Sequence, residues 1–255
     1  MPLQVGDHVS HRYRVLRPLG QGGMARVFLV EDEPTAQRLV LKELRAPHAE
    51  LIAAFRAEFA LLAGLTHPRL TRVHDFGATQ LRGEWLHYYT AAWIDGATLR
   101  EHARQAPERW LGPLADALEG LLALHDLGVV HGDFTPDNVL VEASGGGVLI
   151  DLGCARPRGQ SSESIAGTPG FLAPELQQSG TADVASDLYA VGVSLQQLQQ
   201  LARGQPRREL SELISRLLAE DPQQRPSSVR SVLAALGQHA AAGRSRAARS
   251  LRLVG

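Results

Sequence analysis

Two short runs in the middle of the chain carry the side chains most able to do chemistry. The first reads HGDFTPDN at 131–138, and the second reads DLG at 151–153. In phosphoryl transfer, one carboxylate orients the attacking hydroxyl and accepts its proton, while other oxygen ligands hold magnesium ions against the nucleotide phosphates. The spacing of these residues predicts that Asp133 is the catalytic carboxylate and that Asn138 and Asp151 bind magnesium.

A glycine-rich turn near the N-terminus is the second candidate for chemistry. It reads LGQGGMARV at 19–27, and Gly20 and Gly22 would let the backbone approach phosphate groups closely. The turn stands between two strand-like segments, which excludes the strand-to-helix setting of a dinucleotide fold or a Walker A loop. Such a turn alone also fits an ordinary hairpin, so its interpretation depends on the residues that follow.

A lysine and a glutamate complete this half of the predicted site. Lys42 stands 22 residues after Gly20, in the strand-like segment VLK, and would reach the α- and β-phosphates. Glu58 lies in a mostly apolar helical segment, from which it would face inward and pair with Lys42. The alternative is that both are surface residues, which is the usual place of Lys and Glu. Their order and their strand and helix positions favour the ion pair.

A third motif, GTPGFLAPE, follows at 167–175. The order of the glycine-rich turn, the lysine, HGDFTPDN, DLG and this motif matches the signature set of protein kinases. The chain therefore resembles the bacterial serine/threonine protein kinases. The resemblance implies an enzyme that uses ATP and Mg to phosphorylate serine or threonine in a protein substrate, which the sequence does not identify.

The resemblance also assigns roles to individual residues. Thr168 would bond Asp133 and shape the seat of the substrate hydroxyl, Glu175 would pair with Arg225, and Asp187 would brace the catalytic loop. The implied nucleotide-binding set is Leu19, Gly20, Gln21, Gly22, Gly23, Met24, Ala25, Val27, Val40, Lys42, Ala92, Ile94 and Leu140. Within this set, the backbone at positions 92 and 94 would bond the adenine edge, and the side chains at 27, 40 and 140 would sandwich the ring.

Two positions depart from the family pattern. Gly132 stands where an arginine that reads a phosphorylated activation loop is common, so loop phosphorylation should matter less here. Thr135 stands where a lysine usually stabilises the γ-phosphate. These changes make the loop similar to that of small-molecule phosphotransferases such as the aminoglycoside kinases, which remain an alternative. A nucleotide-binding pseudokinase scaffold is a further alternative, disfavoured because the residues expected to do the chemistry are all present.

The elements that must position these residues change character along the chain. Strands are expected at 13–19, 25–30, 38–44, 69–76 and 84–92, with a helix over 49–64. Helices are then expected at 98–105, 110–127, 183–202, 210–219 and 227–240, with Thr98 and Ser227 as N-caps, and short strands at 139–141 and 148–150. This pattern predicts an α+β, bilobal, protein-kinase-like fold. A small antiparallel sheet with one main helix precedes a mostly helical lobe, which lacks one helix of the family because the connection at 203–209 is short.

Three regions follow from this reading. We expect an ATP-binding N-terminal lobe at 1–92, a catalytic C-terminal lobe at 93–240, and a basic tail or linker at 241–255. The tail is either a solvated end or a linker to a further C-terminal domain outside this chain. Ser161, Ser162 and Ser164 lie in the expected activation segment and are candidates for autophosphorylation, with a passive polar loop as the alternative.

Composition narrows the remaining possibilities. The chain has 255 residues, a net charge of -1 and one cysteine. A nearly neutral chain offers no electrostatic footprint for nucleic acid, and a single cysteine fits a reducing compartment. The N-terminus lacks the apolar core of a signal peptide, and no apolar run reaches about 18 residues. We therefore expect a cytoplasmic protein with no nucleic-acid or membrane partner.

Overall fold

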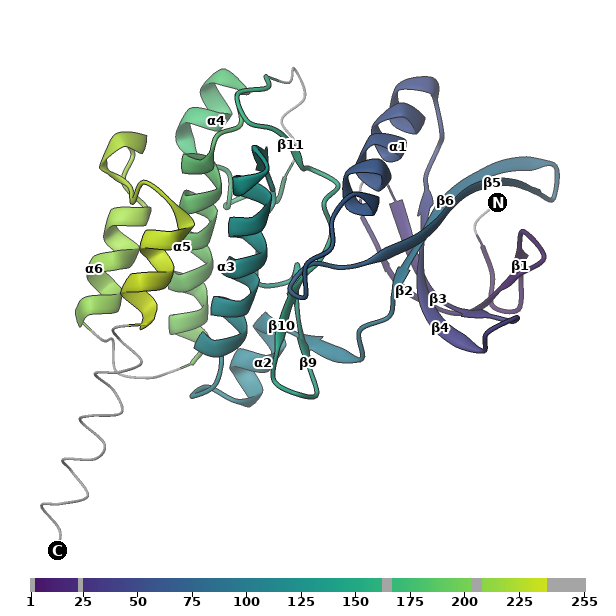
Figure 1. Ribbon diagram of the computed structural model, residues 1–255, viewed down its shortest axis with the longest axis horizontal. Coiled ribbons are helices and arrows are strands. Elements are labelled where there is room, and N and C mark those ends of the chain that lie inside the picture. The colour runs from purple at the N-terminus through teal and green to yellow at the C-terminus, as the bar shows by residue number, and fades with distance from the viewer. Residues whose placement is uncertain (1–2, 23–24, 162–166, 203–207, 238–255) are drawn as a thin grey trace, which may run out of the picture. The chain divides into compact units, whose positions relative to one another are not determined.

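The computed structural model describes residues 3–22, 25–161, 167–202 and 208–237. The chain folds into two compact units, Met1–Asp95 and Gly96–Gly255 (Figure 1). The boundary lies after Asp95 rather than after Ala92. The guanidinium of Arg17 lies 5.7 Å from the ring centroid of Trp93, which attaches the residue after Ala92 to the first unit. The predicted tail, Gly23, Met24, Ser162 and Ser164 fall outside the described residues.

An antiparallel sheet forms most of the first unit. Its strands are β1 (His8–Val9), β2 (Tyr13–Gln21), β3 (Ala25–Asp32), β4 (Gln37–Leu44), β5 (Val73–Leu81) and β6 (Glu84–Ala92). They are hydrogen-bonded in the order β1-β2-β3-β4-β6-β5. Side chains alternate between the two faces of a strand, and one face buries Val15, Val30 and Leu41 almost completely. The four strands predicted at 13–19, 25–30, 38–44 and 84–92 are confirmed, with ends that move by two residues at most.

The strand predicted at 69–76 is wrong in its bounds, because β5 runs from Val73 to Leu81. A two-residue turn sets this range. Arg82 and Gly83 have φ values of 53° and 83°, so Leu81 pairs directly with Glu84 at the start of β6. Positive φ at both turn residues gives the backbone twist that joins two antiparallel strands. The hairpin thus extends the pairing beyond the segment whose composition looked most strand-like.

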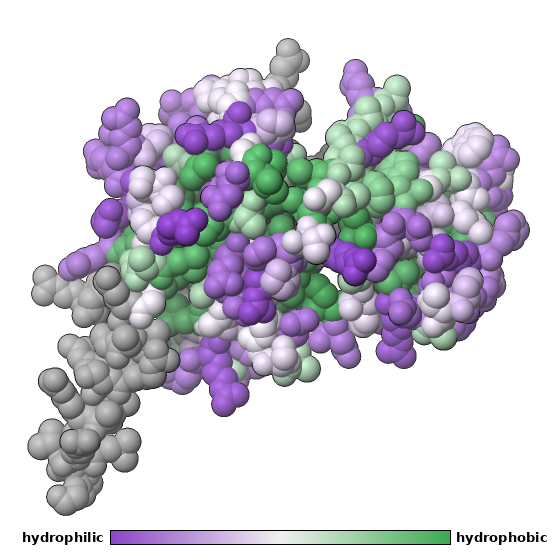
Figure 2. Space-filling view, viewed as in Figure 1, coloured by the Kyte–Doolittle hydropathy of each residue, from purple (hydrophilic) through white to green (hydrophobic). Residues whose placement is uncertain are grey.

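One helix, α1 (Ala49–Ala63), belongs to the first unit and confirms the helix predicted over 49–64. Phe55 and Leu62 are its buried residues, and it contacts β4 and β5. Alanines occupy much of the rest of the helix, and Figure 2 shows a mildly hydrophobic surface over it. The helix is therefore attached to the sheet by a narrow stripe of large side chains.

Helices dominate the second unit. They are α2 (Leu99–Gln105), α3 (Leu111–Asp126), α4 (Pro174–Ser179), α5 (Val184–Leu201) and α6 (Arg208–Leu217), with a 3-10 helix at Pro222–Gln224 and a further helix over 229–237. Short strands accompany them: β7 (Gly96–Thr98), β8 (Val129–Val130), β9 (Val139–Glu142), β10 (Gly147–Leu149) and β11 (Arg156–Pro157). The strands pair as β10-β9-β7 and as β11-β8. Only residues 202–207 separate α5 from α6, the short connection that the sequence indicates.

The helix starts show which capping signals were correct. The Thr98 hydroxyl accepts from the backbone N–H of Glu101, and the Glu101 carboxylate accepts from the backbone N–H of Thr98, so the predicted N-cap is confirmed as a capping box. The prediction of Ser227 as an N-cap is wrong. The helix begins at 229, and Ser228 accepts a bond of 3.3 Å from the N–H of Ser231. Both serines have the side chain of an N-cap, so the residue type does not show which of them caps the helix. The position at which the helical backbone begins determines it.

Helices α3 and α5 both contribute fully buried leucines to the core of the second unit. Leu114, Leu118 and Leu121 on α3 have no exposed surface, and Leu195 and Leu198 on α5 have none either. Helix α5 is buried over most of its length, so it serves as the rigid internal support for the loops around it. Among the described residues, no helix combines the length and apolar character needed to span a membrane.

Candidate active site

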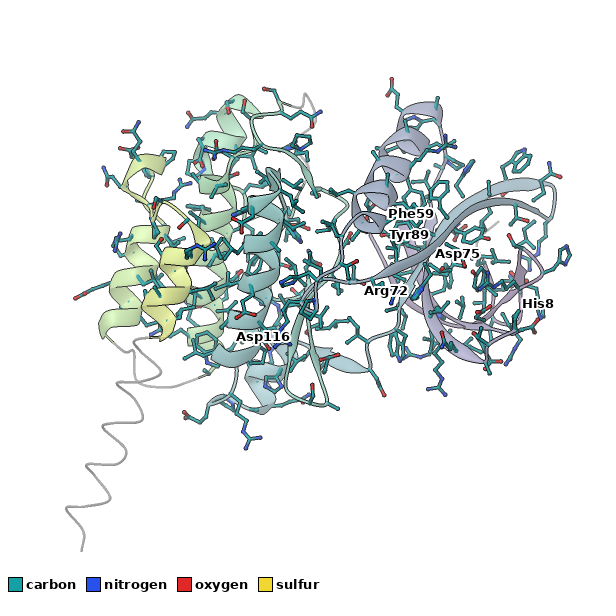
Figure 3. The ribbon with its side chains drawn as sticks, in the orientation of Figure 1. His8, Phe59, Arg72, Asp75, Tyr89 and Asp116 are labelled. Carbon is teal, nitrogen blue, oxygen red and sulfur yellow. The ribbon has the colours of Figure 1, made fainter. Side chains whose placement is uncertain are left out.

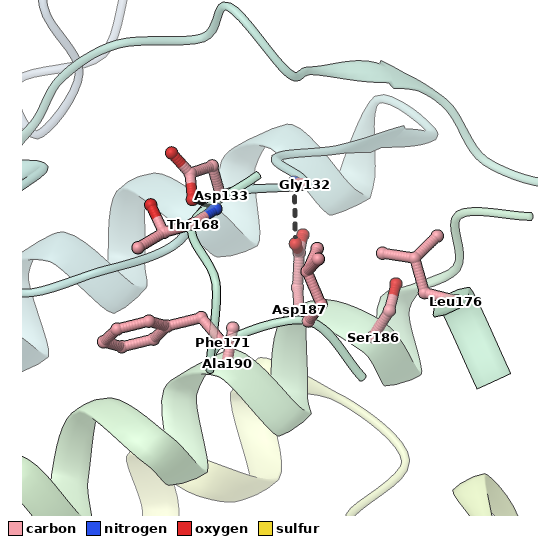
Figure 4. A pocket seen from close by; sticks show the side chains of 9 residues that line it. Gly132, Asp133, Thr168, Phe171, Leu176, Ser186, Asp187 and Ala190 are labelled. Carbon is pink, nitrogen blue, oxygen red and sulfur yellow. Dashed lines mark hydrogen bonds between the residues drawn. The ribbon is translucent and has the colours of Figure 1, made fainter. Parts of the chain in front are cut away.

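The loop that carries Asp133 is attached to α5 by a buried carboxylate. Asp187 on α5 is 1% exposed and accepts the backbone N–H groups of His131 at 2.8 Å and Gly132 at 2.9 Å. Its Oδ2 also lies 2.8 Å from Nε2 of His125. Figure 4 shows Asp187 reaching up from the helix to Gly132. The bracing role that the sequence analysis gives to Asp187 is confirmed as a set of hydrogen bonds.

Asp133 is held on both carboxylate oxygens. Its Oδ1 accepts the backbone N–H of Thr168 at 2.8 Å, and its Oδ2 accepts from Nδ2 of Asn138 at 3.2 Å. Nδ2 of Asn138 also donates to the backbone carbonyl of Asp133 at 2.9 Å. The expected bond from Thr168 is therefore present, although it comes from the backbone and not from the hydroxyl. A carboxylate that only accepts hydrogen bonds keeps lone pairs available for a proton from a hydroxyl.

The two expected magnesium ligands are brought together through the backbone. The N–H of Ile150, the residue before Asp151, donates to the carbonyl of Asn138 at 2.8 Å. Because Nδ2 of Asn138 is bonded to Asp133, the amide oxygen faces away from that residue and remains a possible ligand. Asp151 has a φ of 61°, a conformation that non-glycine residues rarely adopt and that is enriched at functional sites.

A small pocket opens beside Asp133 in the second unit (Figure 4). It is lined by Gly132, Asp133, Thr168, Phe171, Leu172, Leu176, Ser186, Asp187 and Ala190. Four of these residues, Phe171, Leu172, Leu176 and Ala190, have apolar side chains, and the carboxylate of Asp133 lies among them. The carboxylate of Asp133 therefore has an apolar wall on one side.

The phosphate-binding residues of the first unit lie on its sheet. The glycine-rich turn joins β2 to β3, where Gly20 pairs with Val27 and the N–H of Gly22 donates to the carbonyl of Ala25 at 2.9 Å. Lys42 on β4 lies opposite Val27, and its Nζ is 2.8 Å from Oε1 of Glu58 on α1. The predicted pairing of the lysine with the glutamate is therefore present in the structure.

The expected adenine-binding residues are placed on three strands or their ends. Val40 on β4 pairs with Ala91, and Leu140 on β9 pairs with Thr98 of β7. The backbone N–H of Ala92 already donates to the carbonyl of Arg72 at 2.8 Å. Ala92 could therefore meet a ligand only through its carbonyl, which refines the expectation for this position. Leu19 and Gln21 lie in β2, Ala25 begins β3, and Ile94 follows β6.

Sequence reasoning missed one member of this cluster. Tyr89 on β6 donates from its hydroxyl to Oε1 of Glu58 at 2.8 Å. The available signal was the register of the sheet, which sets Tyr89 directly opposite Lys42. The sequence motif contains no tyrosine at this place, so only the pairing of β4 with β6 shows it.

A sequence model described as protein kinase domain matches residues 13–206. The chain belongs to the protein kinase family.

Several bacterial kinases are similar to this chain. The probable serine/threonine-protein kinase PknB of Lactococcus lactis is 31% identical over 208 residues, covering 77% of this chain and 32% of that protein. Serine/threonine-protein kinase PknB of Mycobacterium tuberculosis is 32% identical, covering 74% and 32% of the two chains. Kinase pkn2 of Myxococcus xanthus is 36% identical, covering 71% and 23%. The chain thus spans at most about a third of the length of these relatives.

The kinase family pattern is also met by an internal ion pair of the second unit. Nη1 and Nη2 of Arg225 donate to the two oxygens of Glu175 at 2.6 and 2.9 Å. The same guanidinium donates to the backbone carbonyls of Ala185 and Ala219, both at 2.9 Å. The predicted pair is confirmed, and it ties the motif at 167–175 to α5 and to the turn before the last described helix.

Thr135, which stands where kinases usually have a lysine, stabilises the turn that leads to Asn138. It is 2% exposed, and its hydroxyl accepts the backbone N–H of Asn138 at 3.3 Å while its carbonyl accepts the same N–H at 3.1 Å. The side chain thus closes the turn that presents Asn138. Arg100 and Asp137 secure the same loop from outside through bonds of 2.8 and 2.9 Å.

Gly132, which replaces the common kinase arginine, is required by the local backbone. Its φ is 78°, and a Cβ built on it would stand 2.6 Å from the carbonyl oxygen of Cys154. We expect Gly132→Ala to lower the free energy of unfolding by about 2 kcal/mol, because it adds a backbone clash to the cost of a left-handed φ. Urea unfolding measures this change.

Gly159 offers a matched control for that experiment. Its φ is 80°, yet nothing lies within 4 Å of the Cβ position. Gly159→Ala therefore carries the cost of the backbone conformation without the clash. Equal destabilisation by the two substitutions would show that the contact with Cys154 is unimportant.

His131 introduces a pH dependence into the stability of the second unit. Burial lowers the pKa of this imidazole, although Asp187, Asp133 and Asp151 act in the opposite direction. The imidazole of an unfolded chain has a pKa of about 6.5. Below that pH, His131 is protonated in the unfolded chain and stays neutral in the folded chain. The free energy of unfolding is therefore expected to fall as the pH decreases from 7.5 to 5.5.

Urea denaturation at several pH values tests this expectation. The slope should be smaller in His131→Gln, and it should be unchanged in His48→Gln, because the His48 side chain is exposed and makes no capping bond. An identical slope in the wild type and His131→Gln would contradict the assignment of the pH dependence to His131.

Proposed function

We propose that this chain is an ATP-dependent serine/threonine protein kinase domain that transfers the γ-phosphoryl group to a protein hydroxyl. The observation that carries the proposal is the bond from Thr168 N–H to Asp133 Oδ1. It joins the carboxylate expected to receive the hydroxyl proton to the GTPGFLAPE segment, which belongs to the protein-kinase signature. The names of the relatives, all serine/threonine kinases, support the same acceptor chemistry.

The proposed mechanism uses residues from both units. Lys42, held by Glu58, and the backbone of residues 19–25 would bind the phosphates. Asp133 would orient the acceptor hydroxyl and accept its proton as the oxygen attacks the γ-phosphorus, and the bond to the bridging oxygen breaks as ADP leaves. The protein thus contributes mainly positioning and charge stabilisation.

Asn138 and Asp151 fit the expected metal. Amide and carboxylate oxygens are ligands that Mg²⁺ accepts, and this ion commonly takes one or two protein ligands together with waters and substrate phosphates. When bound, magnesium would neutralise charge on the nucleotide phosphates. Asp133 fixes the amide of Asn138 through the bonds of 2.9 and 3.2 Å, so this ligand is oriented before any ion arrives.

We also propose autophosphorylation within the activation segment and action in the cytoplasm, where ATP is supplied. Ser161 supports the first idea because it is an exposed hydroxyl within the described part of the segment. Its Oγ lies 2.9 Å from Oγ1 of Thr181, and the two residues form a β-bridge. A phosphate on Ser161 would break this hydroxyl contact, so modification there would loosen the base of the segment.

Transfer of label from ATP tests the proposed function. The purified chain is incubated with γ-labelled ATP and Mg²⁺, once with a mixture of protein acceptors and once with a mixture of amino sugars. We expect label on serine or threonine of protein, with phosphosite mapping to show whether Ser161 is a target. Label on an amino sugar alone would identify a small-molecule phosphotransferase. No transfer at all, with ATP still bound, would identify a scaffold.

A further inference from the structure

A buried tyrosine is connected to the lysine–glutamate pair in a way that the kinase signature does not contain. Tyr89 on β6 lies opposite Lys42 on β4 in the register of the sheet. The Tyr89 hydroxyl and Nζ of Lys42 both donate to the same atom, Oε1 of Glu58, each at 2.8 Å. A carboxylate oxygen has two lone pairs and can accept both bonds. The three side chains therefore form one hydrogen-bonded unit.

The ring of Tyr89 strengthens this connection by packing on α1. Its centroid lies 5.0 Å from that of Phe55 and 6.0 Å from that of Phe59, and both phenylalanines are on the helix. Figure 3 shows Tyr89 and Phe59 next to each other between α1 and the sheet. Nζ of Lys42 lies 5.7 Å from the Tyr89 centroid, within the range of a cation–π contact. Tyr89 thus touches the helix and the lysine together.

Helix α1 is also held on the sheet by Phe55 and Phe59, whose rings lie 6.0 and 5.3 Å from that of Phe76 on β5. Its N-cap residue, His48, makes no capping bond with its side chain, and its buried residues are Phe55 and Leu62. The Glu58 side chain is 8% exposed and that of Lys42 is 12% exposed. Because these side chains are largely shielded from solvent, a hydrogen bond to the carboxylate is stronger than it would be in water. The ring contacts hold the helix, and the bonds from Lys42 and Tyr89 set the position of the Glu58 carboxylate.

We propose that Tyr89 is a positioning residue for the Lys42–Glu58 pair. Its hydroxyl fixes the carboxylate of Glu58 and its ring fixes α1, so that Lys42 is already directed for the phosphates before nucleotide binds. This role deepens the proposed kinase function and rests on it. Hydrogen bonds to charged groups are the strong ones, so loss of the hydroxyl should lower kcat/KM for ATP by about tenfold.

Tyr89→Phe is the informative substitution because it keeps the ring and removes only the hydroxyl. Tyr88→Phe is its matched control. Tyr88 is the preceding residue of β6, and it is 5% exposed where Tyr89 is 4% exposed. Its hydroxyl donates to Oγ of Ser10 at 2.7 Å. We expect Tyr89→Phe to lower kcat/KM for ATP and to leave KM for the protein acceptor unchanged. Tyr88→Phe should change neither constant.

A double-mutant cycle separates positioning from general stability. In a Glu58→Ala background the hydroxyl has lost its acceptor, so Tyr89→Phe should have no further effect on the residual kcat/KM. An equal loss in both backgrounds would overturn the proposal, as would wild-type kinetics for Tyr89→Phe.

Hydrogen exchange gives a readout that needs no phosphoryl transfer. Amides over 51–63 should exchange faster in Tyr89→Phe than in the wild type or in Tyr88→Phe. If the wild type transfers no phosphate, the proposed function fails while this measurement still tests the anchoring of α1. Unchanged exchange in Tyr89→Phe would overturn the anchoring itself.

Discussion

Replacing Asp133 by Asn is expected to lower the rate of phosphoryl transfer by about 10²- to 10⁴-fold, the usual contribution of a positioned general base. The amide has nearly the same shape, and its oxygen can still accept the N–H of Thr168, which lies 2.8 Å from Oδ1 in the wild type. It cannot accept a proton from the acceptor hydroxyl at neutral pH. Rapid-quench measurement of labelled phosphate on the acceptor, at saturating ATP, gives the rate directly.

Asp137→Asn is the matched control for this substitution. It removes the same charge from the same loop, four residues away, where the carboxylate is 52% exposed and paired with Arg100. We expect its transfer rate to stay within about twofold of wild type, because an exposed pair contributes little. Calorimetric titration with ATP and Mg²⁺ checks that Asp133→Asn still binds nucleotide. Equal rates for Asp133→Asn and the wild type would contradict the assignment of Asp133 as the base.

The features predicted well from sequence are those set by local pattern. The strand predicted at 84–92 coincides with β6, and the helical repeat of apolar residues predicts α1 to within one residue. The bond between Thr168 and Asp133 and the bracing of the catalytic loop by Asp187 were implied by the resemblance to protein kinases, which rests on the order of the motifs. Their roles in catalysis stay predictions until the kinetic tests are done.

The features that sequence missed depend on partners distant along the chain. The bounds of β5 follow from the turn at Arg82-Gly83 and from pairing with β6, and no property of 77–81 alone signals a strand. The strand predicted at 148–150 starts one residue earlier, at Gly147 of β10, where a Cβ would stand 2.0 Å from the carbonyl oxygen of Pro113 on α3. Tyr89 likewise acquires its bond to Glu58 only when helix and sheet are packed together.

The second large effect is expected for Arg225→Leu. This substitution should lower the free energy of unfolding by about 3–5 kcal/mol, because removing one partner of a buried ion pair has a cost of this size. The Arg225 side chain is 0% exposed, and that of Glu175 is 26% exposed. Without the guanidinium, the Glu175 carboxylate keeps its charge with no cation beside it. The carbonyls of Ala185, Ala219 and Glu220 lose a donor as well. Thermal melting, with a fall of about 10 °C for this size of chain, measures the loss.

Two further variants decide whether the loss comes from the unpaired carboxylate. Arg230→Leu breaks an exposed pair, in which the Arg230 side chain is 73% exposed and that of Asp126 is 62% exposed. It should lower the free energy of unfolding by less than about 0.5 kcal/mol. The double variant Arg225→Leu with Glu175→Leu removes both charges and should recover part of the stability lost in Arg225→Leu, because the desolvated charge is gone. If the double variant melts no higher than Arg225→Leu, the lost bonds to the backbone carbonyls, and not the unpaired carboxylate, would account for the effect. A melting temperature for Arg225→Leu equal to that of Arg230→Leu would show that the pair does not hold the GTPGFLAPE segment to α5 at all.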